Sequence, residues 1–176
     1  PKWPTPLKED YRVIYENGFN AVQTKASTSP SYFTEVLGVA KESGLMLDVS
    51  LYPSGIVKEN LESYKNIIIL HKGHPNVLTW KIIDEPDLRK EELKMEVPEA
   101  YREYKELDPD TPVLLTLAPG SEEKYSYWSN FCDVFQVDPY PIPGKPLTFV
   151  ADHVARAKSL LEPWQNLTIV LQCGWK

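Results

Sequence analysis

Apolar residues along the chain follow two spacings, and the segments that carry them alternate. After residue 29, Phe33, Val36, Leu37 and Ala40 recur at intervals of three and four, which predicts a helix with one apolar face. Other apolar runs are short, continuous and bounded by turn residues, which is typical of buried strands. Helices are predicted over residues 7–16, 29–43, 58–71, 92–107, 122–128 and 148–161. Strands are predicted over residues 20–24, 45–51, 77–83, 112–117, 134–137 and 168–172.

Each predicted strand is followed by a turn and a helix, which indicates parallel strands with helices packed outside. A doubly wound sheet and a barrel both fit this order. No Gly-rich phosphate loop opens a predicted helix, and this argues against a nucleotide-binding doubly wound sheet. The strand exits carry Pro, Tyr, Asp and Glu, as the substrate-facing loops of a barrel do. We therefore favour an α/β fold of the TIM type.

The length indicates that this (β/α) barrel is incomplete. An eight-strand barrel takes about 250 residues, and the chain has 176. We expect one barrel domain over residues 1–176, with about six strands and without the first and last. The edges left by two missing strands invite association, so the expected partners include a second copy or the missing barrel segments.

One stretch joins a buried strand to candidate chemistry. The run from His74 passes through Trp80 and ends in two acids, Asp84 and Glu85, before Pro86. Proline has no N–H to donate, so it ends the strand. Carboxylates at the carboxyl end of a buried strand lie where α/β barrels and sheets hold reacting groups. The alternative is that both acids only cap the next helix.

Composition limits the partners and says little about location. The net charge of −6 argues against nucleic acid or an anionic membrane as partner, and the longest apolar run, Ile67–Leu70, is too short to span a bilayer. Cys132 and Cys173 are expected to be buried free thiols. No secretory signal is visible at the start of the sequence, but its absence does not decide the location. We expect a secreted or periplasmic location.

Further side chains lie at or near the predicted strand exits. Asp138 leaves a strand before Pro-Tyr-Pro, where it either belongs to a site or makes an Asx-Pro turn. Asp48 lies within a strand and either faces the mouth of the barrel or pairs with a base. Aromatic rings suit stacking on the apolar faces of sugars, and those near the exits are Tyr52, Tyr140 and Trp175.

No cofactor is expected, and without a His-rich cluster a zinc site has little support. A hard cation held by Asp48, Asp84 and Asp138 is a third interpretation.

Two segments carry a family resemblance. The stretch His74–Leu78 through Trp80 to Asp84-Glu85-Pro86 resembles the fourth strand of retaining glycoside hydrolases with (β/α)8 barrels, of the β-galactosidase-like and cellulase-like families. Val134–Tyr140 is similar to their sixth strand. The resemblance covers strands two to seven in order. It implies an oligo- or polysaccharide substrate and the role of general acid/base for Glu85.

The chain departs from the family at two positions. Asp84 stands where the family usually has an asparagine that bonds the sugar, and Gln172 matches the nucleophilic glutamate. A carboxamide cannot act as a carboxylate nucleophile. Another acid substitutes, the mechanism differs, or the protein binds glycans without cleaving them. Strand spacing favours an inverting route among these, with Asp138 as general base roughly 6.5–9.5 Å from Glu85.

The resulting site hypothesis has two parts. Glu85 and Asp138 are the expected catalytic residues. Substrate binding is assigned to Asp84, Asp48, Tyr52, Tyr140, Gln172 and Trp175.

Overall fold

The computed structural model describes residues 8–25, 30–51, 57–89 and 91–173, with the backbone only for 57–61. Helices and strands alternate along these residues as the sequence predicts. The helices are α1 (Lys8–Glu16), α2 (Pro30–Ser43), α3 (Val57–His71), α4 (Leu93–Leu107), α5 (Glu122–Ser129) and α6 (Thr148–Leu160). The strands are β1 (Ala21–Lys25), β2 (Met46–Ser50), β3 (Val77–Asp84), β4 (Val113–Leu117), β5 (Val134–Val137) and β6 (Asn166–Ile169), and a 3₁₀ turn, η1 (Pro86–Leu88), follows β3.

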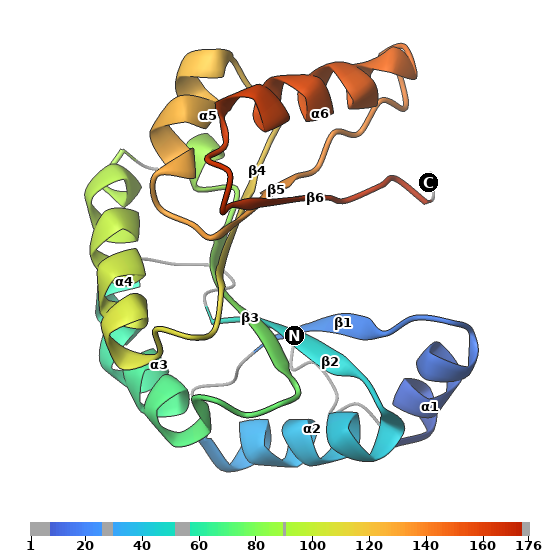
Figure 1. The fold of residues 1–176 in the computed structure, drawn as a ribbon, viewed down its shortest axis with the longest axis vertical. Coiled ribbons are helices and arrows are strands. Elements are labelled where there is room, and N and C mark those ends of the chain that lie inside the picture. Colours follow the sequence, from blue (N-terminus) through green and yellow to red (C-terminus); the bar gives the residue numbers. More distant parts are fainter. Residues whose placement is uncertain (1–7, 26–29, 52–56, 90, 174–176) are drawn as a thin grey trace.

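The six strands form one parallel sheet in the order β1-β2-β3-β4-β5-β6. The sheet curls, and the helices cover its outer side, so the chain has the shape of a C with β1 and β6 on either side of the opening (Figure 1). This confirms the predicted incomplete α/β barrel of the TIM type.

The last strand lies earlier in the chain than predicted. Pairing with β5 aligns Val134 with Asn166 and Val137 with Ile169, so β6 covers residues 166–169 rather than 168–172. Gln172 consequently lies beyond the strand.

The main core lies between the sheet and the helices, around Trp80 of β3. The Trp80 ring packs on Phe33 of α2 with 6.2 Å between ring centroids, and its indole N–H donates to the carboxylate of buried Asp108 at 2.9 Å. Successive side chains of a strand point to opposite faces. Thr79 and Lys81 therefore face the inside of the curl.

The inner face of the sheet carries polar side chains that bond from strand to strand. Thr79 donates to Asp48 of β2. On the other side of the curl, Thr116 of β4 donates to Gln136 of β5 at 2.6 Å. Gln136 in turn donates to Thr168 of β6 at 3.3 Å. Strand β6, at one end of the sheet, is thus joined to its neighbour by side chains as well as by backbone.

Strand β3 has a β-bulge that matters for the site. Lys81 pairs with Leu114 of β4, yet Asp84 pairs with Thr116, so β3 uses one residue more than β4 over this interval. The bulge places Asp84 in the same row as Thr116.

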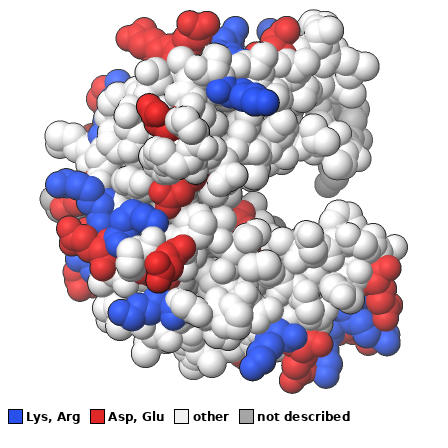
Figure 2. All heavy atoms as spheres, viewed as in Figure 1, with Lys and Arg blue, Asp and Glu red and all other residues white. Residues whose placement is uncertain are grey.

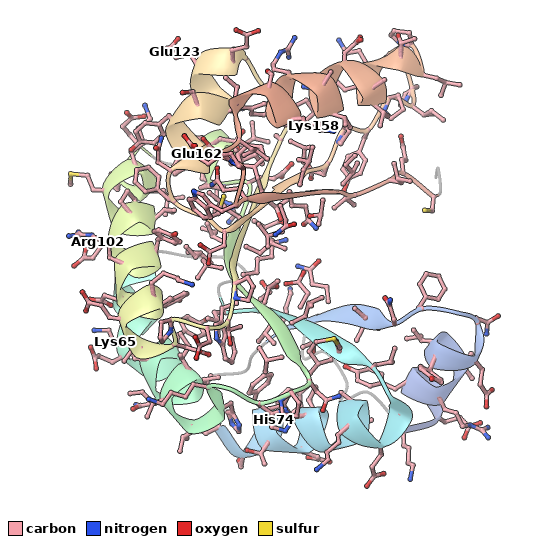
Figure 3. The ribbon with its side chains drawn as sticks, viewed as in Figure 1. Lys65, His74, Arg102, Glu123, Lys158 and Glu162 are labelled. Atoms are coloured by element: carbon pink, nitrogen blue, oxygen red, sulfur yellow. The ribbon has the colours of Figure 1, made fainter. Side chains whose placement is uncertain are left out.

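Charged side chains lie mainly over the outer helices. Around the rim of the C in Figure 2 the surface is rich in Lys, Arg, Asp and Glu, whereas the surface along the notch is mostly uncharged. Lys65 of α3 bonds Glu103 of α4 at 3.1 Å and so joins two outer helices (Figure 3). No helix in the described part of the chain is long and apolar enough to cross a membrane.

The two cysteines are both free, as expected, but only one is buried. Cys132 is buried, whereas the expectation of burial is wrong for Cys173, which is exposed because it follows the end of β6.

Candidate active site

Strand β4 lies between the two acids that the sequence singles out. The Glu85 N–H donates to the carbonyl of Thr116 at 3.0 Å, and the Asp138 N–H donates to the carbonyl of Leu117 at 3.3 Å. The acids that follow β3 and β5 are therefore both hydrogen-bonded to the end of the same strand. Asp138 is 5 % exposed, whereas Glu85 is half-buried.

The side chains of Glu85 and Asp138 are in hydrogen-bonding contact. Burial raises the pKa of Asp138 to about 7, and the charge of Glu85, this hydrogen bond and the charge of Asp84 add to the effect. Asp138, beside Glu85, therefore keeps its proton to near neutral pH. The expected gap of roughly 6.5–9.5 Å is wrong, because both backbones are drawn to the end of β4 and the side chains meet.

One oxygen of Asp138 has no partner in the described part of the chain. Its Oδ1 is buried and accepts no hydrogen bond. A buried polar atom without a partner is costly, and in native structures it calls for an explanation such as a catalytic role or a bound ligand.

Glu85 has an unusual backbone conformation. With φ 47° and ψ 56° it is left-handed, and it is the one residue other than glycine with positive φ in the described ranges. Such a conformation costs about 1–3 kcal/mol and persists only where the surroundings enforce it. Glu85 precedes η1 but makes no side-chain capping bond to it. The capping interpretation of Glu85 is thus not what the structure shows.

The loop after Glu85 is fixed by Asp87. The Asp87 side chain is 1 % exposed and forms an ion pair with Lys124 of α5. Its Oδ1 also accepts a hydrogen bond from the N–H of Ala118, just after β4, at 3.4 Å. Sequence reasoning missed this pair, since nothing in the sequence shows that α5 returns to the end of β3.

Asp84 and Asp48 are connected through a lysine that the sequence analysis overlooked. Lys81 is 2 % exposed, and its Nζ lies 2.7 Å from Oδ1 of Asp84. Burial raises the pKa of Asp48, while the bond from Thr79 and the charge of Lys81 oppose the rise. The signal that could have found Lys81 is a lone charge in the middle of an apolar strand.

Tyr140 joins the carboxyl pair. Burial and the charges of Asp138, Glu85 and Asp84 raise the pKa of Tyr140. The residue as a whole is exposed, which leaves ring surface open to a ligand.

Gln172 has a structural contact rather than a free amide. Its Oε1 accepts from the N–H of Ile142 at 3.0 Å, and its Nε2 donates to the Ile142 carbonyl at 2.9 Å. Gln172 thus fastens the end of the described chain to the loop after β5. Tyr52 and Trp175 lie outside the described residues.

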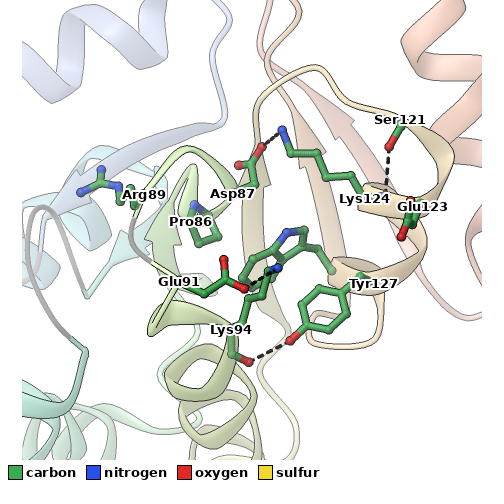
Figure 4. A pocket seen from close by; sticks show the side chains of 10 residues that line it. Pro86, Asp87, Arg89, Glu91, Lys94, Ser121, Glu123, Lys124 and Tyr127 are labelled. Carbon is green, nitrogen blue, oxygen red and sulfur yellow. Dashed lines mark hydrogen bonds and ion pairs between the residues drawn. The ribbon is translucent and has the colours of Figure 1, made fainter.

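A pocket of about 430 Å³ lies beside the acids, next to the Asp87–Lys124 pair (Figure 4). The charged groups that line it are largely paired with one another, as Lys94 is with Glu91 at 2.7 Å. The Tyr127 hydroxyl donates to the Lys94 carbonyl at 2.8 Å. The pocket therefore flanks the carboxyl pair without containing it.

Among the described residues, no three His, Cys, Asp or Glu side chains converge as a metal site would require. The hard-cation interpretation of Asp48, Asp84 and Asp138 accordingly has no support there. Instead, Asp84 is bonded to Lys81 and Asp138 is in contact with Glu85.

No protein-family model matches the sequence, and no curated protein is significantly similar to it. Solved structures are similar in fold. The chain superposes on the β-glucuronidase of Dictyoglomus thermophilum with a TM-score of 0.69 and 17 % identity, over 93 % of this chain and 31 % of that protein. The Bacteroides uniformis β-glucuronidase gives 0.67 and 17 % identity over 91 % and 21 %. The endo-1,4-β-mannanase of Eisenia fetida gives 0.63 and 12 % identity over 80 % and 62 %.

The fold is that of the barrels in these three proteins. The chain spans 21 %, 31 % and 62 % of the lengths of these three proteins, less than two thirds in every case. At identities of 12–17 % the likeness concerns the fold alone.

Proposed function

We propose that this chain carries the acid/base half of a glycoside hydrolase site, with Glu85 as proton donor and Asp138 as its partner. The observation that supports this most is the contact between a half-buried and a buried carboxyl group that together hold a proton near pH 7. Glycoside hydrolysis needs a carboxylic acid that is still protonated at working pH, together with a second carboxyl group. The solved structures of similar fold named above are glycosidases, which agrees with this proposal.

The proposed step uses the proton of the pair. Asp138 passes its proton to Glu85, the more exposed member, and Glu85 donates it to the glycosidic oxygen as the bond from that oxygen to the anomeric carbon breaks. The carboxylates left behind stabilise the positive charge that develops on the sugar. Water then adds its hydroxyl to the anomeric carbon and returns its remaining proton to the pair, so the site is restored.

The groups around the pair suit a carbohydrate. The exposed ring of Tyr140 offers an apolar face beside Asp138. Asp84, whose side chain is 46 % exposed, offers a carboxylate to sugar hydroxyls and is steadied by Lys81. Asp48 is farther inside the curl, and its oxygen is engaged by Thr79. Tyr52 and Trp175 remain binding residues proposed from sequence.

Hydrolysis of a panel of aryl glycosides tests this function. The panel should include glucuronides, galactosides and mannosides, assayed with wild type, Glu85→Gln, Asp138→Asn and the pocket variant Glu91→Gln. We expect Glu85→Gln and Asp138→Asn each to lower kcat by about 10²–10⁴-fold, with unchanged far-UV circular dichroism. Glu91→Gln should retain wild-type turnover, since Glu91 only pairs with Lys94.

The pH dependence of the same reaction gives a second criterion. Activity should fall as pH rises through about 7, because the pair then loses the proton that it donates. A substrate that Glu85→Gln hydrolyses as fast as wild type contradicts the assignment.

A non-catalytic glycan-binding barrel is the second candidate, and Gln172 favours it. Its amide is bonded at both ends to Ile142, and it stands where a nucleophile is expected. In that case the chain should bind an oligosaccharide in titration calorimetry without releasing reducing ends, and Glu85→Gln should leave turnover at zero.

A further inference from the structure

The left-handed conformation of Glu85 needs an explanation outside Glu85 itself. Its own backbone bonds are one from its N–H to Thr116 and one to its carbonyl from Leu88 at 3.2 Å. Neither bond involves the Glu85 side chain. The restraint that distinguishes this loop is two residues further on, at Asp87.

Asp87 is a buried anion, and its carboxylate needs a cation and hydrogen-bond donors around it. Its side chain is almost fully enclosed, and it is paired with Lys124 and with the N–H of Ala118. A buried carboxylate is tolerated where a cation and hydrogen-bond donors meet it. The β3 exit is therefore fixed to the β4 exit and to α5 at once.

Lys124 is equally restricted. Ser121 caps α5 by accepting from the N–H of Lys124 at 3.3 Å. The stem of Lys124 passes so close to Gly120 that a Cβ there would lie 2.3 Å from its Cδ. The ammonium group of Lys124 forms the ion pair with Asp87 that Figure 4 shows from the pocket side.

We propose that Asp87 and Lys124 form a positioning pair that holds Glu85 in its left-handed conformation against Asp138. This role rests on the glycosidase function proposed above. With the pair intact, the segment from Glu85 to Asp87 is fixed at both ends, by β4 at Glu85 and by α5 at Asp87. When the pair is broken, Glu85 relaxes to an ordinary backbone conformation and its carboxyl group leaves Asp138.

The experiment compares two pairs that line the same pocket. Lys124→Met and Asp87→Asn each remove one partner of the buried pair, and Lys94→Met removes one partner of the exposed Glu91–Lys94 pair as a matched control. Carbon-13 NMR of carboxyl groups follows the titration of Asp138, which faces Glu85, Asp84 and Tyr140. This measurement needs no substrate, so it decides the positioning role even if no glycoside is hydrolysed.

In Lys124→Met and Asp87→Asn we expect the titration midpoint of Asp138 to fall by at least about one pH unit, because the charge of Glu85 is withdrawn. On a substrate identified in the panel, kcat should fall at least about tenfold with KM within about twofold, as expected for misplaced reacting groups. The double variant should be no worse than either single one. Lys94→Met should match wild type throughout.

The proposal is overturned if folded Lys124→Met keeps the wild-type titration of Asp138. It is also overturned if the two single variants have additive effects on kcat. Asp87→Asn leaves a lysine whose side chain is 24 % exposed and can reach solvent, so the titration of this variant decides the question if Lys124→Met, which leaves the enclosed Asp87 carboxylate without a cation, does not fold. Absence of hydrolysis by wild type contradicts the proposed function, while the NMR titration still decides the role of the pair.

Discussion

Lys81 and Asp84 form an ion pair across the bulge of β3, with 2.7 Å between Nζ and Oδ1. Lys81 is enclosed inside the curl of the sheet, while Asp84 is partly open to solvent. The same lysine opposes the rise in the pKa of Asp48. One buried cation thus balances two of the carboxylates on the inner face.

Replacing Lys81 with methionine keeps the length of the side chain and removes the charge. We expect Lys81→Met to lower the free energy of unfolding at pH 7 by about 1–3 kcal/mol. The folded-state pKa of Asp48 then rises further above its unfolded value, so the loss should shrink as pH falls toward 4 and Asp48 becomes protonated in both states. Urea unfolding at several pH values measures this. Lys158→Met on the exposed face of α6 is the control, and equal stability of Lys81→Met and wild type at pH 7 contradicts the expectation.

Asp138 should make the protein less stable as pH rises. Its folded-state pKa is raised to about 7 from an ordinary 3.8, so the folded chain binds more protons than the unfolded chain between these values. Stability is then complete below about pH 4 and is lost as pH rises through about 7. Asp138→Asn removes this dependence. The variant should gain about 2–4 kcal/mol relative to wild type between pH 4.5 and pH 8, whereas parallel stability curves in urea unfolding argue against the buried pair.

The substitution Gln172→Glu should not create a catalytic nucleophile. In Gln172→Glu the group that donates to the Ile142 carbonyl becomes a second acceptor, so a bond is replaced by repulsion. We expect a loss of about 0.5–2 kcal/mol in unfolding free energy at pH 7, recovered at low pH where the glutamate regains a proton. Thermal melts at pH 7 and pH 4 measure the difference. A gain of glycosidase activity in this variant shows that the residue reaches the site after all.

The open edges of the sheet should promote association. Strand β1 pairs with β2, and β6 pairs with β5, so each has one edge beside which the described residues place no strand. We expect the isolated chain of 176 residues to sediment as larger species as its concentration rises. Leu171, 62 % exposed just beyond β6, adds apolar surface there, and Leu171→Lys should weaken the association. A single monomeric boundary at all concentrations contradicts this prediction.

The architecture could be predicted because its signals are local. Apolar spacing and turn residues marked every described helix and strand to within a few residues, and the largest displacement is that of β6. There the start is set by pairing with β5, a partner distant in sequence. Asp84, Glu85, Asp138 and Tyr140 were found because each stands at or next to a strand end.

Contacts between elements could not be predicted in the same way. The approach of Lys124 to Asp87 depends on how α5 packs. His153 of α6 is buried because Tyr125 and Phe149 pack on it, with the Tyr125 hydroxyl 3.0 Å from Nδ1, and the contact with Tyr125 depends on how α5 and α6 pack. The spacing of Glu85 and Asp138 was also wrong, since ideal strand separations ignore how side chains lean over the intervening strand.

The bulge in β3 allows Lys81 and Asp84, which are three positions apart, to lie on the same face of the sheet. In a regular strand, residues three positions apart point to opposite faces. Because β3 has one residue more than β4 between Lys81 and Asp84, Asp84 instead lies in the same row as Thr116. Exchanging Ile82 or Ile83 for another apolar residue alters packing alone. Deleting either one should remove the bulge without turning the acids to the other face, because Asp84 would then follow Lys81 at the regular two-residue spacing and still pair with Thr116.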